Sequence, residues 1–231
     1  MIDNCNLIII VKTLSNNKIS YSRLNNLINN FSKYNINIFL MPTIDDVNNP
    51  DRRRVMYNSL MDRLKIVTKL NYEYILLIDD DFFPIDNFLE ELNETIKYLP
   101  ETWDTLHLAI GSVWGRKKRG GFKGLGVYNP NTDLSSLEPD KCDRFFINCK
   151  KGFLTERKGI KIHNGAMGSP MAWLFRSEKI NHILEEYKKY EYNGKNKIFN
   201  NDIILTKMID DNTFICKKPL GYECECGGTT Y

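Results

Sequence analysis

The chain has 231 residues, of which 42% are hydrophobic and 26% are charged, and its 32 basic and 29 acidic residues give a net charge of +3. This composition is typical of an ordinary globular protein, and it excludes disorder, collagen and coiled coil. The near balance of charge provides no global field for nucleic acid, and no apolar run approaches the roughly 20 residues that span a bilayer. We therefore expect no nucleic-acid partner and no integral membrane segment.

The N-terminal residues enter an apolar run at 7–11 without a cationic leader or a small-residue cleavage site, which favours a cytoplasmic protein. Six scattered cysteines are too few for a disulfide scaffold, so we expect reduced thiols. Cys224 and Cys226 give only a weak zinc signal, because no second ligand pair has the usual spacing.

The first half of the chain alternates short apolar runs with amphipathic helical patterns, which predicts a parallel sheet flanked by helices. The predicted elements are, in chain order, a strand at 7–11, a helix at 20–34, a strand at 36–40, a helix at 51–70, a strand at 74–78, a helix at 85–98 and a strand at 105–110. Residues 111–160 show neither period, and such long irregular stretches are usually functional. The last predicted elements are a strand at 172–175, helices at 177–190 and 201–209, and a strand at 213–216.

Three aspartates, Asp79, Asp80 and Asp81, directly follow the apolar strand at 74–78, at the end where open α/β sheets bind their ligands. Alternation in an extended segment sends Asp79 and Asp81 to one side and Asp80 to the other. Two carboxylates on one side repel each other unless a cation lies between them, and a hard ion such as Mn²⁺ or Mg²⁺ prefers oxygen ligands. The motif predicts such an ion on Asp79 and Asp81, with a phosphate-bearing ligand. The alternative is that the aspartates cap the next helix and face solvent.

An apolar strand that ends in Asp-x-Asp after two strand-helix units resembles the metal-binding motif of glycosyltransferases with the GT-A fold. Further segments resemble the lipopolysaccharide-type and collagen-galactosyltransferase-like branch: Tyr-Ile-Leu-Leu-Ile-Asp-Asp-Asp-Phe at 74–82, Leu-Pro-Glu-Thr-Trp-Asp-Thr-Leu at 99–106, and residues 165–177. The likeness covers most of residues 5–210, but only the triple aspartate is specific. The chain differs from that branch at Asp79, where Glu is more common, and at Asn58 and Ser59, where Ser-His is usual.

The resemblance implies one GT-A domain over residues 1–231, with a Rossmann-like mixed sheet that is mostly parallel and flanked by helices. Residues 1–104 would form the nucleotide-binding half and residues 105–231 the acceptor-side half. The implied activity is transfer of a sugar, with inversion, from a nucleoside-diphosphate donor to a hydroxyl of a glycan or glycoprotein.

The resemblance also implies site residues. Asp81 would ligate an ion that bridges the donor diphosphate, and Asp79 would contact the ribose or the metal through water, with Asp80 beside them. Base and ribose would lie over the ends of the first two strands, which offer Lys12, Thr13 and Asp45. These last three residues are equally well explained as turn chemistry.

Inversion requires a general base on the acceptor side, and the late aspartate of the family corresponds to Asp202. Asp202 is equally well explained as the N-cap of a helix. The alternative bases are Glu138, Asp140 and Asp143, which lie in the irregular stretch.

Residues 116–126 place cationic side chains among glycines, which predicts a mobile lid in which Arg116 and Lys117 bind the diphosphate. The alternative is a plain surface loop. Trp114, Phe122 and Trp173 are candidates for stacking on a sugar, although Trp173 lies in a predicted strand and is also explained by core packing.

Two other functions remain open. A haloacid-dehalogenase-type phosphohydrolase would use Asp79 as nucleophile and Asp81 as acid and base, with Asp210 and Asp211 as late magnesium ligands. The two strand-helix units before the motif, and Phe83 where Thr or Val is expected, argue against it. The other alternative is a nucleotide-sugar binding module without catalysis.

Overall fold

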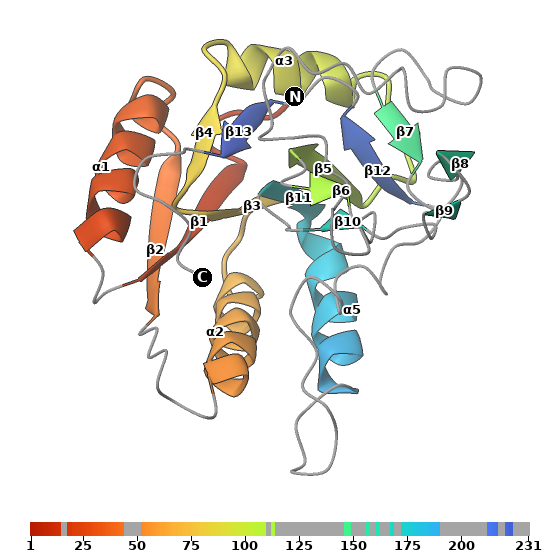
Figure 1. The fold of residues 1–231 in the computed structure, drawn as a ribbon. Coiled ribbons are helices and arrows are strands. Elements are labelled where there is room, and N and C mark those ends of the chain that lie inside the picture. Colours follow the sequence, from red (N-terminus) through yellow and green to blue (C-terminus); the bar gives the residue numbers. More distant parts are fainter. Residues whose placement is uncertain are drawn as a thin grey trace.

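The computed structural model of the protein describes residues 1–14, 18–43, 52–109, 112–113, 146–148, 156–157, 160–161, 167–168, 172–189, 212–216 and 220–223 (Figure 1). The strands of its main sheet are β1 (Leu7–Leu14), β2 (Asn37–Thr43), β3 (Tyr74–Asp79), β5 (Thr105–Ala109), β7 (Phe146–Asn148), β11 (Ala172–Arg176) and β12 (Thr213–Cys216). Three strand pairs lie outside it: β4 (Phe82–Pro84) with β13 (Gly221–Glu223), β6 (Ser112–Val113) with β10 (Met167–Gly168), and β8 (Glu156–Arg157) with β9 (Ile160–Lys161). The helices are α1 (Lys18–Ser32), α2 (Arg52–Val67), α3 (Phe88–Ile96) and α5 (Ser177–Lys188).

The main sheet has the order β2-β1-β3-β11-β5-β12-β7. Strands β2, β1 and β3 are parallel, and β11 runs antiparallel to both of its neighbours, β3 and β5. Strand β12 is parallel to β5, and β7 is antiparallel to β12. All but β11 and β7 therefore run in one direction, which confirms the predicted mixed, mostly parallel α/β sheet.

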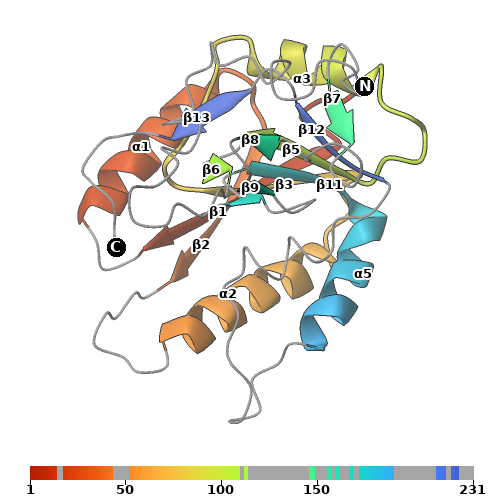
Figure 2. The same ribbon diagram turned by 45° about the vertical axis from the view of Figure 1, so that its right-hand side comes forward.

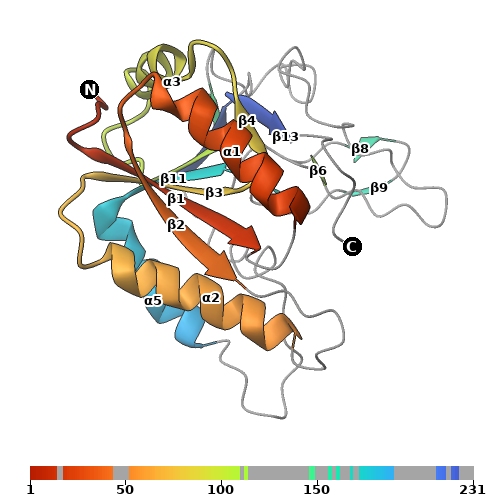
Figure 3. The same cartoon turned by 90° about the vertical axis from the view of Figure 1, so that its left-hand side faces the viewer.

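Helices cover both faces of this sheet. Helices α1 and α3 contribute to one hydrophobic cluster, and α2 and α5 contribute to the other. Figure 3 shows α1 on one side of the strands and α2 with α5 on the other, and Figure 2 shows α2 beside α5. In β1, Leu7, Ile9 and Val11 join the first cluster while Ile8 and Ile10 join the second. A strand that is buried on both faces must be apolar throughout, which explains the continuous run at 7–11.

The predicted helix at 85–98 begins later than expected. The chain first forms β4, and α3 starts only at Phe88. The turn between these two elements is held by hydrogen bonds to Tyr34. The Tyr34 hydroxyl donates to the Asp86 carbonyl (2.6 Å) and accepts from the Phe88 N–H (2.8 Å). A side chain distant in sequence thus satisfies an N–H group that a local cap would otherwise serve.

The stretch predicted to be irregular, 111–160, contains short strands, of which β7 joins the edge of the main sheet. The predicted helix at 201–209 lies outside the described residues. Within the described ranges, no helix is both long enough and apolar enough to cross a membrane.

Candidate active site

A polar edge forms where β1 and β3 end side by side. The parallel register sets Lys12 opposite Asp79, so each residue comes at the end of a buried apolar strand. Thr13 is buried, and its hydroxyl shares a hydrogen bond of 3.0 Å with the Ser20 hydroxyl. This bond fixes the first turn of α1 against the end of β1.

Asp79 lies near cations from two different elements. Lys12 Nζ is 4.0 Å from Asp79 Oδ1. Arg63 of α2 is only 4% exposed; burial lowers its pKa from the ordinary value, while the negative charge of Asp79 opposes the shift. A buried guanidinium requires an anionic neighbour, and Asp79 provides that counter-charge.

Asp81 is paired with an arginine of α1, on the face of the sheet opposite to α2. Strand β3 ends at Asp79 and the next two residues form a turn, so the alternation expected for an extended segment stops there. Asp81 Oδ2 lies 3.7 Å from Arg23 Nη1 of α1, and the two side chains are 21% and 6% exposed. The arginines near Asp79 and Asp81, Arg63 of α2 and Arg23 of α1, therefore come from helices on opposite faces of the sheet.

The alternative in which the aspartates cap the next helix is wrong, whereas their exposure to solvent differs: the side chain of Asp79 is 36% exposed and that of Asp81 is 21% exposed. The next helix, α3, begins only at Phe88, with Asn87 at its N-cap position. Asp80 is 7% exposed, which places its side chain in the protein and not in solvent.

The strand pair β4–β13 fixes the chain directly after Asp81. Its register sets Gly221 opposite Pro84, and Phe82 packs against Phe31 and Phe88 with no exposed surface. A Cβ on Gly221 would come within 2.3 Å of the Phe82 ring and 2.5 Å of the next carbonyl. Only glycine fits at this close approach.

The donor set fits a divalent ion that is shared with a substrate phosphate. Asp79 and Asp81 offer carboxylate oxygens, with Lys12 Nζ 4.0 Å from Asp79 Oδ1 and Arg23 Nη1 3.7 Å from Asp81 Oδ2. Magnesium sites commonly use one or two carboxylates together with substrate phosphates and water. In the described part of the chain, no three His, Cys, Asp or Glu side chains are grouped to hold a metal.

Several predicted site residues lie outside the described residues: Asp45, Trp114, Arg116, Lys117, Phe122, Glu138, Asp140, Asp143, Asp202, Asp210, Asp211, Cys224 and Cys226. Of the aromatic candidates, Trp173 is described and is 4% exposed, with its ring 3.6 Å from the His107 ring and 5.6 Å from the Phe175 ring, centroid to centroid. Trp173 is therefore a core residue and not a platform for a sugar.

Neither Arg23 nor Arg63 was among the site residues predicted from the sequence. Both lie on the apolar side of their helices, Arg23 four residues before the buried Leu27 and Arg63 four residues before the buried Val67. A charged residue on the buried stripe of an amphipathic helix is the sequence signal for a buried cation that pairs with a carboxylate.

No protein-family model matches this chain, and no curated protein sequence matches it. Among solved structures, the chain is similar to a glycosyltransferase involved in the glycosylation of the major capsid of PBCV-1, with a TM-score of 0.54 and 8% identity, over 97% of this chain and 94% of that chain. The two proteins share a fold. The chain also aligns with residues 1–349 of S. aureus TarS in complex with UDP-GlcNAc, with a TM-score of 0.49 and 13% identity, over 97% of this chain and 60% of that one. The first likeness agrees with the glycosyltransferase-type α/β fold expected from the Asp-x-Asp strand.

Proposed function

We propose that this protein is a metal-dependent glycosyltransferase that moves a sugar, with inversion, from a nucleoside-diphosphate donor to a hydroxyl of a glycan or glycoprotein. The observation that carries the proposal is the position of Asp79, Asp80 and Asp81. They end a buried central strand, beside the end of β1, in a fold shared with a glycosyltransferase. We propose a cytoplasmic location for the enzyme.

The donor binds over the ends of β1 and β3. Lys12 offers a partly exposed ammonium group to the diphosphate, and Thr13 with Ser20 keeps this edge rigid. Asp79 contacts the ribose or the metal through water, and Asp80 lies beside it in the donor site. Asp45, Arg116 and Lys117 complete the donor site in this proposal.

Asp79 and Asp81 hold Mn²⁺ or Mg²⁺. When bound, the ion supplies Lewis-acid stabilisation of the charge that grows on the departing nucleoside diphosphate. Lys12 and Arg63 lie near Asp79, and Arg23 lies near Asp81, so each carboxylate has a cationic neighbour before the donor arrives.

Asp202 accepts the proton of the attacking acceptor hydroxyl, with Glu138, Asp140 and Asp143 as the rival bases. Asp202→Asn keeps the shape of the side chain but cannot accept this proton. We expect it to retain donor binding and lose turnover, measured by release of nucleoside diphosphate. Full turnover by this variant would remove Asp202 from the mechanism.

The test of the function is a thermal-shift screen of nucleoside-diphosphate sugars with and without Mn²⁺. A donor that binds the native state raises the apparent Tm by mass action. Asp81→Asn is expected to abolish the Mn²⁺-dependent shift, whereas Asp86→Asn, at an exposed aspartate before α3, is expected to preserve it. Each protein is compared with itself with and without ligand, so a lower starting Tm in Asp81→Asn does not affect the result.

The same screen separates the alternatives. If no nucleotide sugar shifts the wild-type protein in the presence of Mn²⁺, the glycosyltransferase proposal is wrong. Hydrolysis of a phosphomonoester that depends on Asp79 would favour the phosphohydrolase. A donor that binds but is neither transferred nor hydrolysed would favour the non-catalytic module.

A further inference from the structure

The pairing of Arg23 with Asp81 places a buried cation on one of the two carboxylates that would hold the metal. The side chain of Arg23 is 6% exposed, and its Nη1 is 3.7 Å from Asp81 Oδ2. Near the start of α1, the Ser20 hydroxyl is bonded to Thr13 of β1, so the helix that carries Arg23 is anchored at this edge.

Both carboxylates that would hold the metal have a cationic neighbour before any ligand arrives. Lys12 Nζ is 4.0 Å from Asp79 Oδ1, and Arg23 Nη1 is 3.7 Å from Asp81 Oδ2. A divalent cation that enters this edge meets the repulsion of these positive charges, above all that of the guanidinium beside Asp81. A diphosphate counters this repulsion, because its negative charges accompany those of the ion.

We propose that Arg23 competes with the divalent ion for Asp81 and thereby makes metal binding depend on the donor diphosphate. This inference rests on the proposed function. When the donor binds, the guanidinium exchanges Asp81 for a phosphate oxygen, a ligand that suits its planar fork, and Asp81 becomes available to the metal. Because coupling between two ligands is reciprocal, the metal strengthens donor binding by the same factor by which the donor strengthens metal binding.

The consequence is that the ligand-free enzyme holds neither ligand tightly. Metal alone has to displace Arg23 from Asp81, and diphosphate alone adds negative charge beside three aspartates. Each ligand removes the obstacle to the other, so the two bind as a pair.

The test measures the affinity for Mn²⁺ alone and for Mn²⁺ with saturating UDP, GDP or ADP as probes, by electron paramagnetic resonance of free Mn²⁺. In the wild-type protein we expect at least one nucleotide to tighten Mn²⁺ binding by a factor between about 5 and 150. Arg23→Met, which keeps the length of the side chain but removes its charge, is expected to bind Mn²⁺ alone about tenfold more tightly than wild type, because the competing charge is gone. The coupling factor is expected to fall close to 1.

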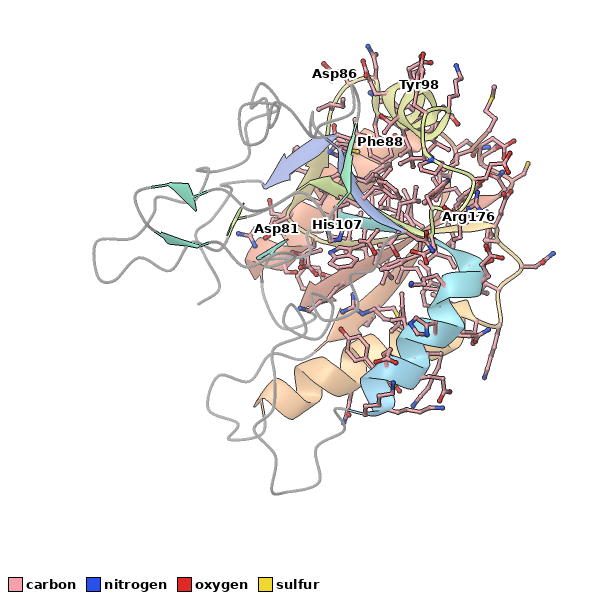
Figure 4. All side chains as sticks on the ribbon, turned by 90° about the vertical axis from the view of Figure 1, so that its right-hand side faces the viewer. Asp81, Asp86, Phe88, Tyr98, His107 and Arg176 are labelled. Atoms are coloured by element: carbon pink, nitrogen blue, oxygen red, sulfur yellow. The ribbon has the colours of Figure 1, made fainter. Side chains whose placement is uncertain are left out.

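Arg176→Met is the matched control. Arg176 ends β11 and lies over the Trp103 ring, and Figure 4 shows it at the opposite end of the sheet from Asp81. The same loss of charge at this distance is expected to leave both the Mn²⁺ affinity and the coupling unchanged. Arg23→Lys, which keeps the charge, is expected to retain the coupling and covers the case in which Arg23→Met does not fold.

Two results would overturn the proposal: equal or weaker Mn²⁺ binding by Arg23→Met than by wild type, or an undiminished coupling factor in that variant. Failure of the proposed function gives a different pattern. In that case no nucleotide alters Mn²⁺ binding by the wild-type protein, while tighter binding of Mn²⁺ alone by Arg23→Met still demonstrates the competition at Asp81.

Discussion

His107 lies in β5 with 2% of its surface exposed, and its ring contacts that of Trp173. Figure 4 shows it between Asp81 and Arg176, in the interior of the sheet. Its Nε2 has no hydrogen-bond partner in the described part of the chain. Burial lowers the pKa of His107 well below its ordinary value, so the imidazole is neutral in the folded protein.

The pKa of His107 is lower in the folded protein than in the unfolded chain, and this difference determines how the free energy of unfolding changes with pH. Below about pH 6.5 the unfolded chain binds a proton at His107 and the folded chain does not, so the free energy of unfolding decreases as the pH falls. Between pH 7.5 and pH 5.5 we expect His107 to account for a loss of up to about 1.4 kcal/mol, measured by urea unfolding. His107→Leu removes that contribution. His182→Gln, which alters an exposed histidine of α5, serves as the control and keeps it. An identical pH dependence in wild type and His107→Leu would contradict the assignment.

At the scale of elements, the pair β4–β13 joins two segments about 140 residues apart and sets the position of Asp81. Gly221→Ala forces a Cβ against the Phe82 ring and the Phe83 carbonyl. Overpacking of this kind costs about 1–3 kcal/mol, and we expect the free energy of unfolding in urea to fall by that amount. Phe82→Leu relieves part of the clash, so Gly221→Ala is expected to cost less in that background, as a double-mutant cycle would show. Unchanged stability of the single variant would mean that this approach is looser than described.

The elements that the sequence predicts correctly are those with a strong local pattern. The buried runs at 7–11 and 74–78 form β1 and β3, and the apolar stripe at Leu24, Leu27 and Phe31 forms the inward face of α1. Strands of two or three residues, such as β4 and β13, carry no period, because distant backbone pairing and not local preference creates them. For the same reason the start of α3 depends on Tyr34, which no pattern around residue 88 reveals.

The candidate site shows the same division. The three aspartates can be recognised in the sequence because they directly follow a hydrophobic strand. Arg23 and Arg63 could not be assigned to the site in this way. A helical pattern shows which face of a helix is buried, but it does not show which carboxylate a cation on that face contacts. The sequence therefore indicates the three aspartates and Lys12, whereas Arg23 and Arg63 become apparent only from the packing of α1 and α2.

At the scale of the whole molecule, the aspartates follow β3, which pairs with the central and buried strand β1. Strand β1 lies between β2 and β3, and residues 8–11 are at most 4% exposed. Amide hydrogens in such a strand exchange with solvent only when the entire domain unfolds. A ligand that binds only the folded state slows this exchange by the factor by which it stabilises the fold, about tenfold at ten times its Kd. The deuterium uptake of β1 therefore measures the affinity of any candidate donor without a transfer assay, and uniform slowing along the strand is the expected result.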